Sequence, residues 1–198
     1  MTLPPEWVLV VADDATERMR LFGLLERDRY HATVADDADD ALELLRAEPF
    51  DLVLVDLLRL EPDAYSLLER MRSDRQFRPV PVVVISAVAQ PEIVARCLHL
   101  GADDYVLKPC DPAVLRARLA TSLEKRRLRQ READYVEVMG QLAEAVAAVR
   151  AETFDPSRLD PLSRRSDPLG DLARAVQQMA SEVDRLRRDT TGSQHAGQ

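Results

Sequence analysis

Five polar residues follow short apolar runs of the sequence and have the chemistry to handle a charged group. In chain order they are Asp13, Asp14, Asp56, Ser86 and Lys108. Carboxylates that converge on one place repel one another, and a divalent cation with oxygen ligands, such as Mg²⁺, relieves that repulsion. A lysine adds a fixed positive charge, and a serine adds a hydroxyl. Brought together, these groups could neutralise a phosphoryl group during its transfer.

An α/β fold over residues 1–123 would bring these side chains together. Five runs suited to strands alternate with four stretches of helical spacing. The strand-like runs are 7–12, 30–35, 51–56, 80–86 and 104–108, and the helical stretches are 17–28, 38–47, 64–72 and 92–100. Three of the runs are almost continuously apolar, which is typical of strands buried on both faces of a parallel sheet. The pattern predicts a five-stranded parallel doubly wound sheet, which binds ligands beyond the carboxyl ends of its strands.

The acidic and apolar motifs resemble the receiver domain of bacterial response regulators over roughly residues 6–123. The matching stretches are Asp13 after VLVV, Asp56 after DLVLV, Ser86 after PVVVI, and GADDYVLKP at 101–109. The resemblance implies a flavodoxin-like fold. It also implies that Asp56 accepts a phosphoryl group from a histidine kinase or a phosphotransfer protein. We therefore expect a phosphoacceptor with at most autophosphatase activity, and not a conventional enzyme.

The resemblance implies a Mg²⁺ cofactor whose ligands come from two strand ends. Asp13 and Asp56 would be ligands, together with the backbone carbonyl of Leu58, and Asp14 stands near enough to contribute. One departure affects this site, because Ala12 stands where the family usually has the first of two acids. Plain helix capping by Asp13 or Asp14 is the alternative interpretation of this acidic pair.

Further roles are implied for residues near the ends of the last two strands. Lys108 would pair with the acyl phosphate, and Ser86 would donate a hydrogen bond to a phosphoryl oxygen. Tyr105 would follow Ser86 as a second switch residue, although ordinary core packing explains Tyr105 equally well. The peptide bond before Pro109 would be cis.

The sequence after residue 123 changes character and predicts a coiled-coil extension. We expect a long helix over 124–153, a connector over 154–167, a second helix over 168–188 and a disordered tail over 189–198. Heptad spacing predicts one apolar seam in each helix. The seams comprise Tyr135, Met139, Leu142, Val146 and Val149 in the first helix, and Leu169, Leu172, Val176, Met179, Val183 and Leu186 in the second.

The stretch SDPLGDLARAVQQM at 166–179 resembles a HAMP-type signalling module, and the similar region spans 142–179. The resemblance implies a parallel four-helix coiled coil made by two chains. A generic dimerising helical hairpin is the alternative. Both interpretations predict a homodimer through the C-terminal helices, because a single heptad helix leaves an apolar seam exposed.

Composition excludes several other classes of protein. The net charge is −8, and the excess of acid lies in residues 1–123, so neither part looks like a nucleic-acid surface. No apolar run is long enough for membrane insertion, and the first residues do not resemble a secretion signal. Cys97 and Cys110 do not suggest a disulfide framework, so a cytoplasmic location is expected.

The leading hypothesis is a two-component response regulator whose phosphorylation acts through a dimeric coiled coil on a downstream protein partner. A pseudo-receiver scaffold that is not phosphorylated is an alternative, and Ala12 is its main support. A phosphatase with an aspartate nucleophile is a second alternative. Enzymes of that kind need another acid two residues after the nucleophile, where this sequence has Leu58.

Overall fold

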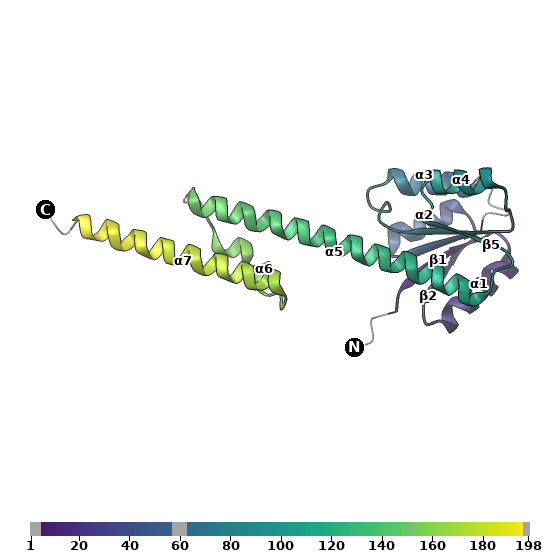
Figure 1. Ribbon diagram of the computed structural model, residues 1–198, viewed down its shortest axis with the longest axis horizontal. Coiled ribbons are helices and arrows are strands. Elements are labelled where there is room, and N and C mark those ends of the chain that lie inside the picture. Colours follow the sequence, from purple (N-terminus) through teal and green to yellow (C-terminus); the bar gives the residue numbers. More distant parts are fainter. Residues whose placement is uncertain (1–4, 57–62, 152, 196–198) are drawn as a thin grey trace. The chain divides into compact units, whose positions relative to one another are not determined.

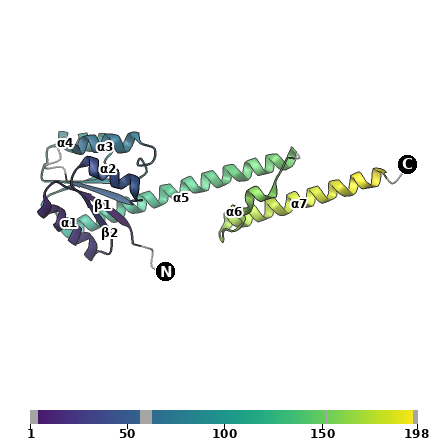
Figure 2. The ribbon, with the colours of Figure 1, turned by 180° about the vertical axis from the view of Figure 1, so that it is seen from behind.

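The structure is a computed structural model that describes residues 5–56, 63–151 and 153–195. The chain forms two compact units, Met1–Leu128 and Arg129–Gln198. The first unit is an α/β domain, and the second is helical (Figures 1 and 2). The helix that contains the boundary, α5, runs without interruption over Pro112–Arg150.

The first unit has the predicted parallel sheet, with strand order β2-β1-β3-β4-β5. Its strands are β1 (Trp7–Val11), β2 (His31–Ala35), β3 (Leu52–Asp56), β4 (Val82–Ser86) and β5 (Asp104–Leu107). The helices between them are α1 (Ala15–Arg27), α2 (Ala38–Ala47), α3 (Asp63–Ser73) and α4 (Pro91–His99). The predicted fold class is confirmed, and the order reverses between β1 and β3, where such sheets bind ligands.

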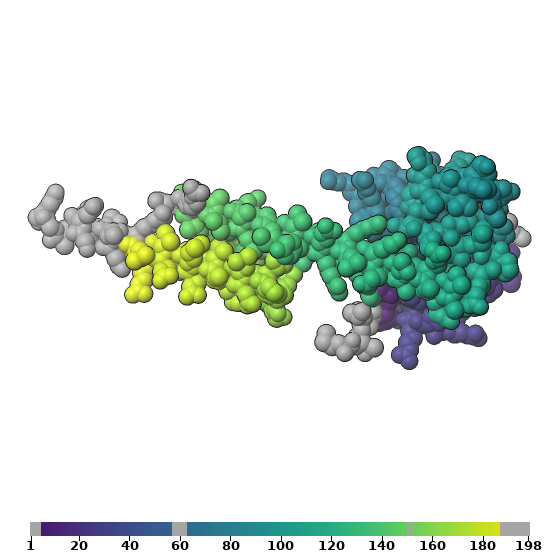
Figure 3. Space-filling view, in the orientation of Figure 1, coloured from purple at the N-terminus to yellow at the C-terminus, as the bar shows by residue number. Residues whose placement is uncertain are grey.

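Successive side chains along each strand point to opposite faces of the sheet, so the core has two layers. Leu9, Val53 and Val84 face one layer, which also contains the buried residues of α2, α3 and α4. Neighbouring strand residues such as Val10 and Leu54 face the other layer, which α1 and the first turns of α5 complete. Figure 1 shows these two groups of helices on opposite faces of the sheet. In the space-filling view of Figure 3, the teal side chains of the second half of this unit make up most of the face presented.

Local signals set where the helices of this unit begin. The Asp14 carboxylate accepts a hydrogen bond from the backbone N–H of Glu17 and caps α1. Asp37 caps α2 in the same way through the N–H of Asp40. Pro91 occupies the first turn of α4, where its missing N–H costs nothing. The Asp14 cap determines which residues occupy the first turn of α1, immediately after the end of β1.

The second unit contains η1 (Pro156–Leu159), α6 (Asp160–Ser163) and α7 (Pro168–His195) beside the last part of α5. In Figures 1 and 2, α7 runs in the same direction as α5, and η1 and α6 lead the chain back between them. The connector expected at 154–167 is therefore partly helical. Its two short helices begin at Asp-Pro steps, and the Asp155 carboxylate accepts from the backbone N–H of Ser157. Leu159 and Leu162 bury their side chains and anchor these turns.

The heptad seams are only partly buried within this unit. The core comprises Val138, Leu142, Ala145, Leu159, Leu162, Ala173 and Val176. Seam residues Tyr135 and Met139 stay exposed on α5, as do Leu172 and Met179 on α7. The second helix also continues beyond its expected end at residue 188, as far as His195, because no proline follows to stop it.

Candidate functional site at the carboxyl edge of the sheet

The register of the strands brings the ends of β1, β3, β4 and β5 to one edge. Val11 pairs with Val55 on the neighbouring strand, so Asp56, the last residue of β3, and Asp13, two residues after β1, lie at the ends of adjacent strands. On the other side of β3, Asp56 itself pairs with Ile85, the residue before Ser86. The candidate residues therefore lie together at the carboxyl edge of the sheet, beside the switch point between β1 and β3.

Asp56 and Lys108 form the central pair of this site. The Lys108 Nζ donates to Asp56 Oδ2 at 2.6 Å, and the Asp56 side chain is only 9% exposed. The backbone N–H of Lys108 donates to the Ser86 carbonyl at 2.7 Å, which fixes the start of the lysine arm beside β4. The peptide bond between Lys108 and Pro109 is cis. A nearly buried carboxylate thus has a cation held against it.

Glu17 is a site residue that sequence reasoning missed. Its Oε1 lies 2.7 Å from Lys108 Nζ, so the lysine is shared between two carboxylates. Arg20 donates to both carboxylate oxygens of Glu17, at 2.7 and 2.8 Å. The hydrogen bonds from Arg20, and then from Lys108, lower the pKa of Glu17 to about 2 despite its partial burial. Its position in the first turn of the helix after β1 could have indicated that Glu17 lies near the strand ends.

A chain of hydrogen bonds joins the two expected switch residues. The backbone N–H of Val88 donates to Ser86 Oγ at 3.0 Å, and the Tyr105 hydroxyl donates to the Val88 carbonyl at 2.7 Å. Ser86 is fully buried, and Tyr105 is partly buried against the core. Core packing and hydrogen bonding thus coexist at Tyr105. The loop after β4 is the physical link between the two side chains.

The acidic pair after β1 is divided between two positions. Asp14 is occupied as the cap of α1, which confirms the capping interpretation for that residue. Asp13 is exposed at the strand end, and Ala12 is fully buried and offers no side-chain oxygen. Arg18 covers this corner, because its guanidinium donates to the Ala12 carbonyl at 2.6 Å and pairs with Asp36 at 2.9 Å.

The carboxylates present fit a magnesium ion that keeps most of its water. Among the residues that the structure describes, no three His, Cys, Asp or Glu side chains are grouped to hold a metal. Mg²⁺ is commonly bound through only one or two carboxylates and several waters, and Asp13 and Asp56 lie at the ends of neighbouring strands, where they would be such ligands. The expected carbonyl ligand, Leu58, lies outside the described residues.

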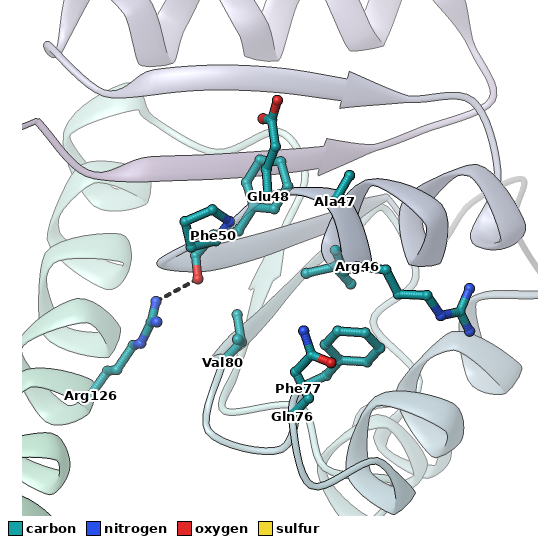
Figure 4. A pocket seen from close by; sticks show the side chains of 10 residues that line it. Arg46, Ala47, Glu48, Phe50, Gln76, Phe77, Val80 and Arg126 are labelled. Atoms are coloured by element: carbon teal, nitrogen blue, oxygen red, sulfur yellow. Dashed lines mark hydrogen bonds between the residues drawn. The ribbon is translucent and has the colours of Figure 1, made fainter.

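A pocket at the opposite end of the sheet is separate from this site. It lies near the starts of β3 and β4, and Phe50, Phe77, Val80 and Arg126 are among its lining residues (Figure 4). Arg126 donates to the Phe50 carbonyl at 2.7 Å and thereby ties α5 to the sheet. Arg126 is therefore a structural residue of the receiver unit.

The fold and the edge with Asp56 and Lys108 define a phosphoacceptor type of α/β domain. A family model described as the response regulator receiver domain matches residues 8–120, more than half of the sequence. The chain therefore belongs to the response regulator receiver domain family. Members of this family are phosphoacceptors of two-component systems and not conventional enzymes, so the phosphatase alternative is not supported.

Relatives with similar sequences match a little over half of the chain. The two-component response regulator ORR7 of Oryza sativa subsp. japonica is 34% identical over 108 residues, 54% of this chain and 51% of that protein. The transcriptional regulatory protein CseB of Streptomyces coelicolor is 40% identical over 118 residues, 60% of this chain and 49% of that protein. The chain thus matches about half the length of each of these relatives, and residues after 120 lie outside the family model.

A solved structure agrees in fold and carries a metal. The receiver domain of the sensor histidine kinase PA1611 from Pseudomonas aeruginosa PAO1 is 26% identical, with a TM-score of 0.56 over 61% of this chain and 98% of that one. Its structure has a magnesium ion coordinated in the active-site cleft.

No described helix of the present chain is long and apolar enough to cross a membrane.

Proposed function

We propose that the chain accepts a phosphoryl group on Asp56 from a histidine kinase or a phosphotransfer protein. The observation that carries the proposal is the 2.6 Å contact between Lys108 Nζ and a nearly buried Asp56 carboxylate. An unpaired carboxylate would be costly to bury at this position. The ammonium group of Lys108 offsets the charge of the Asp56 carboxylate, and it could also offset the charge of a phosphoryl group bound to Asp56. Membership of the receiver family supports the same assignment.

The side chains around Asp56 divide the work of phosphoryl transfer. Lys108 neutralises charge on the phosphoryl oxygens, and the Ser86 hydroxyl donates a hydrogen bond to one of them. Turning Ser86 inward breaks its contact with the Val88 N–H, and Tyr105 follows through the Val88 carbonyl. Mg²⁺ held by Asp13 and Asp56, with the Leu58 carbonyl as a further ligand, would supply additional positive charge when it is bound.

For the helical unit, we propose an output that works as a homodimer and engages a downstream protein partner. Support comes from the large apolar side chains that this unit leaves exposed at heptad spacing, Leu172, Met179 and Leu186. A second copy of the same unit could cover this row, and Tyr135 on α5 is a further exposed apolar side chain. Because α5 is continuous across the boundary between the two units, a displacement of α5 in the receiver unit could change the packing of the helical unit.

A HAMP-like arrangement is supported over a simple hairpin by the direction of the helices. In this unit α7 runs parallel to α5, and Arg165 before α7 pairs with Asp134 on α5 at 2.8 Å. The Asp167 carboxylate accepts from the Gly170 N–H at 3.0 Å and caps α7. A side chain at Gly170 would collide with the carbonyl of Arg165, so the glycine of the motif allows this close approach.

A pseudo-receiver that only acts as a scaffold is the competing function. The observation that favours it is Ala12, which is buried at the position where a second acid would strengthen metal binding. The absence of that carboxylate weakens the field for a cation but leaves Asp56 and Lys108 in contact. The two functions differ in whether Asp56 becomes labelled.

Labelling by a small phosphodonor tests the proposal. The wild-type chain is incubated with acetyl phosphate, with Mg²⁺ or with EDTA, and the phosphorylated fraction is measured by intact mass. We expect Mg²⁺-dependent labelling that Asp56→Asn abolishes, because the amide cannot act as the nucleophile. Asp74→Asn makes the same change at an exposed site and should label normally. An unlabelled wild type, or label that persists in Asp56→Asn, would favour the scaffold.

A further inference from the structure

The ammonium group of Lys108 lies between two carboxylates. Its Nζ is 2.6 Å from Asp56 Oδ2 and 2.7 Å from Glu17 Oε1. The side chains of Lys108 and Glu17 are 16% and 19% exposed, so water screens these contacts only in part. One cation is therefore divided between the expected phosphoacceptor and a second anion.

Glu17 is held in place and kept charged by its own surroundings. Its backbone N–H donates to the Asp14 carboxylate, which fixes the residue in the first turn of α1. Arg20 donates to both carboxylate oxygens in a forked pair, and it shares the oxygen Oε1 with Lys108 Nζ. At neutral pH the group facing Lys108 is thus a fixed anion.

Phosphorylation changes what Lys108 must balance. An Asp56 oxygen attacks the phosphorus of the donor, the donor's bond to phosphorus breaks, and its leaving group departs with the bonding electrons. The acyl phosphate then carries more negative charge than the carboxylate it replaces. Hydrolysis reverses the change, as water attacks phosphorus, loses a proton to solvent, and releases inorganic phosphate and the Asp56 carboxylate. Lys108 stabilises the phosphorylated state only as far as it is free to pair with the phosphoryl oxygens.

We propose that Glu17 is a positioning residue that competes with the phosphoryl group for Lys108 and so shortens the lifetime of the phosphorylated state. The inference rests on the proposed function, phosphoryl acceptance on Asp56. Glu17 acts in two ways that have the same sign. It draws the ammonium group away from the phosphoryl oxygens, and it places a negative charge near them.

The experiment measures the decay of the phosphorylated full-length chain after the donor is removed by desalting. In Glu17→Gln, we expect a lifetime about threefold to fivefold longer, the size of effect of a partly exposed ion pair. Arg20→Gln should shorten the lifetime, because it leaves Glu17 free to bind Lys108 more fully. Glu26→Gln removes the same charge from the last turn of α1 and should leave the lifetime unchanged.

Beryllofluoride affinity gives a second readout that involves no covalent step. Glu17→Gln should bind this phosphoryl mimic more tightly by a similar factor, whereas Glu26→Gln should match the wild type. Equal lifetimes and affinities for Glu17→Gln and the wild type would overturn this inference alone, as would a longer lifetime in Arg20→Gln. A wild type that acquires no label on Asp56 would overturn the proposed function and this inference together.

Discussion

Arg72, near the end of α3, joins two loops of the receiver unit through one guanidinium group. It donates to the carbonyl of Gly101 at 2.8 and 2.6 Å, to that of Arg78 at 2.9 Å and to that of Val80 at 3.0 Å. It also pairs with the Asp103 carboxylate at 2.8 Å. The loops before β4 and before β5 are therefore held by one guanidinium group. Gly101 has a positive φ of 108°, and its lack of a side chain leaves room for the Arg72 side chain.

Replacing Arg72 should destabilise the receiver unit. In Arg72→Leu, several carbonyls and a carboxylate lose their donor, and we expect a loss of about 2–3 kcal/mol in the free energy of unfolding. Arg72→Lys should recover only part of this, because an ammonium group cannot reproduce the planar fork. Urea unfolding measures the loss, with exposed Arg75→Leu as control. A lysine variant as stable as the wild type would show that charge alone is sufficient.

At the residue scale, the sequence predicted the positions of those candidate residues that lie at strand ends. The apolar runs before Asp56, Ser86 and Lys108 bring these residues to one edge of any parallel sheet. The roles of Glu17 and Arg72 could not be predicted in this way. Their partners lie on distant segments, and the direction of a helical side chain relative to a sheet depends on how that helix packs.

At the scale of elements, the strands were easier to predict than the connector. The strands begin and end within two residues of the predicted runs, because continuous β-branched sequence is distinctive and flanked by turns. The connector has no periodicity, so its short helices η1 and α6 were missed. Their burial depends on Val138 and Leu142 of α5, which no local pattern reveals.

Two glycines of the helical unit should respond in opposite ways to the same substitution. At Gly170, an added Cβ meets the Arg165 backbone, so Gly170→Ala should cost about 1–3 kcal/mol through overpacking. At Gly140, nothing lies within 4 Å of the added atom, so Gly140→Ala should stabilise α5 by about 0.5–1 kcal/mol. Thermal unfolding followed by circular dichroism compares the two. Destabilisation by both changes would show that Gly140 also has a packing role.

At the scale of the whole molecule, the proposed homodimer rests on the apolar residues that the helical unit leaves exposed. Leu172 and Met179 are 43% and 44% exposed, and they lie seven residues apart on α7. A dimer would bury this row, and charges placed in it would be desolvated without a partner. The proposed dimer therefore places its interface on α7.

The double variant Leu172→Glu with Met179→Glu should convert the dimer to a monomer at micromolar concentration. Light scattering coupled to size exclusion measures the mass, which for one chain is 22.3 kDa. The control, Gln178→Glu with Ser181→Glu, adds the same charge to exposed positions away from the row and should stay dimeric. Dimers that survive in the first variant, or a monomeric wild type, would contradict the proposed interface.

Trp7 is the one tryptophan of the sequence, and its position makes it useful. Its backbone N–H donates to Asp51, the same carboxylate that pairs with Arg126 of α5, and its indole contacts the rings of His31 and Phe50. A movement of α5 at Arg126 would therefore act on the carboxylate that also holds the backbone of this fluorophore. Tryptophan fluorescence of the unlabelled protein would therefore report whether phosphorylation at the opposite edge of the sheet changes the position of α5 near Arg126.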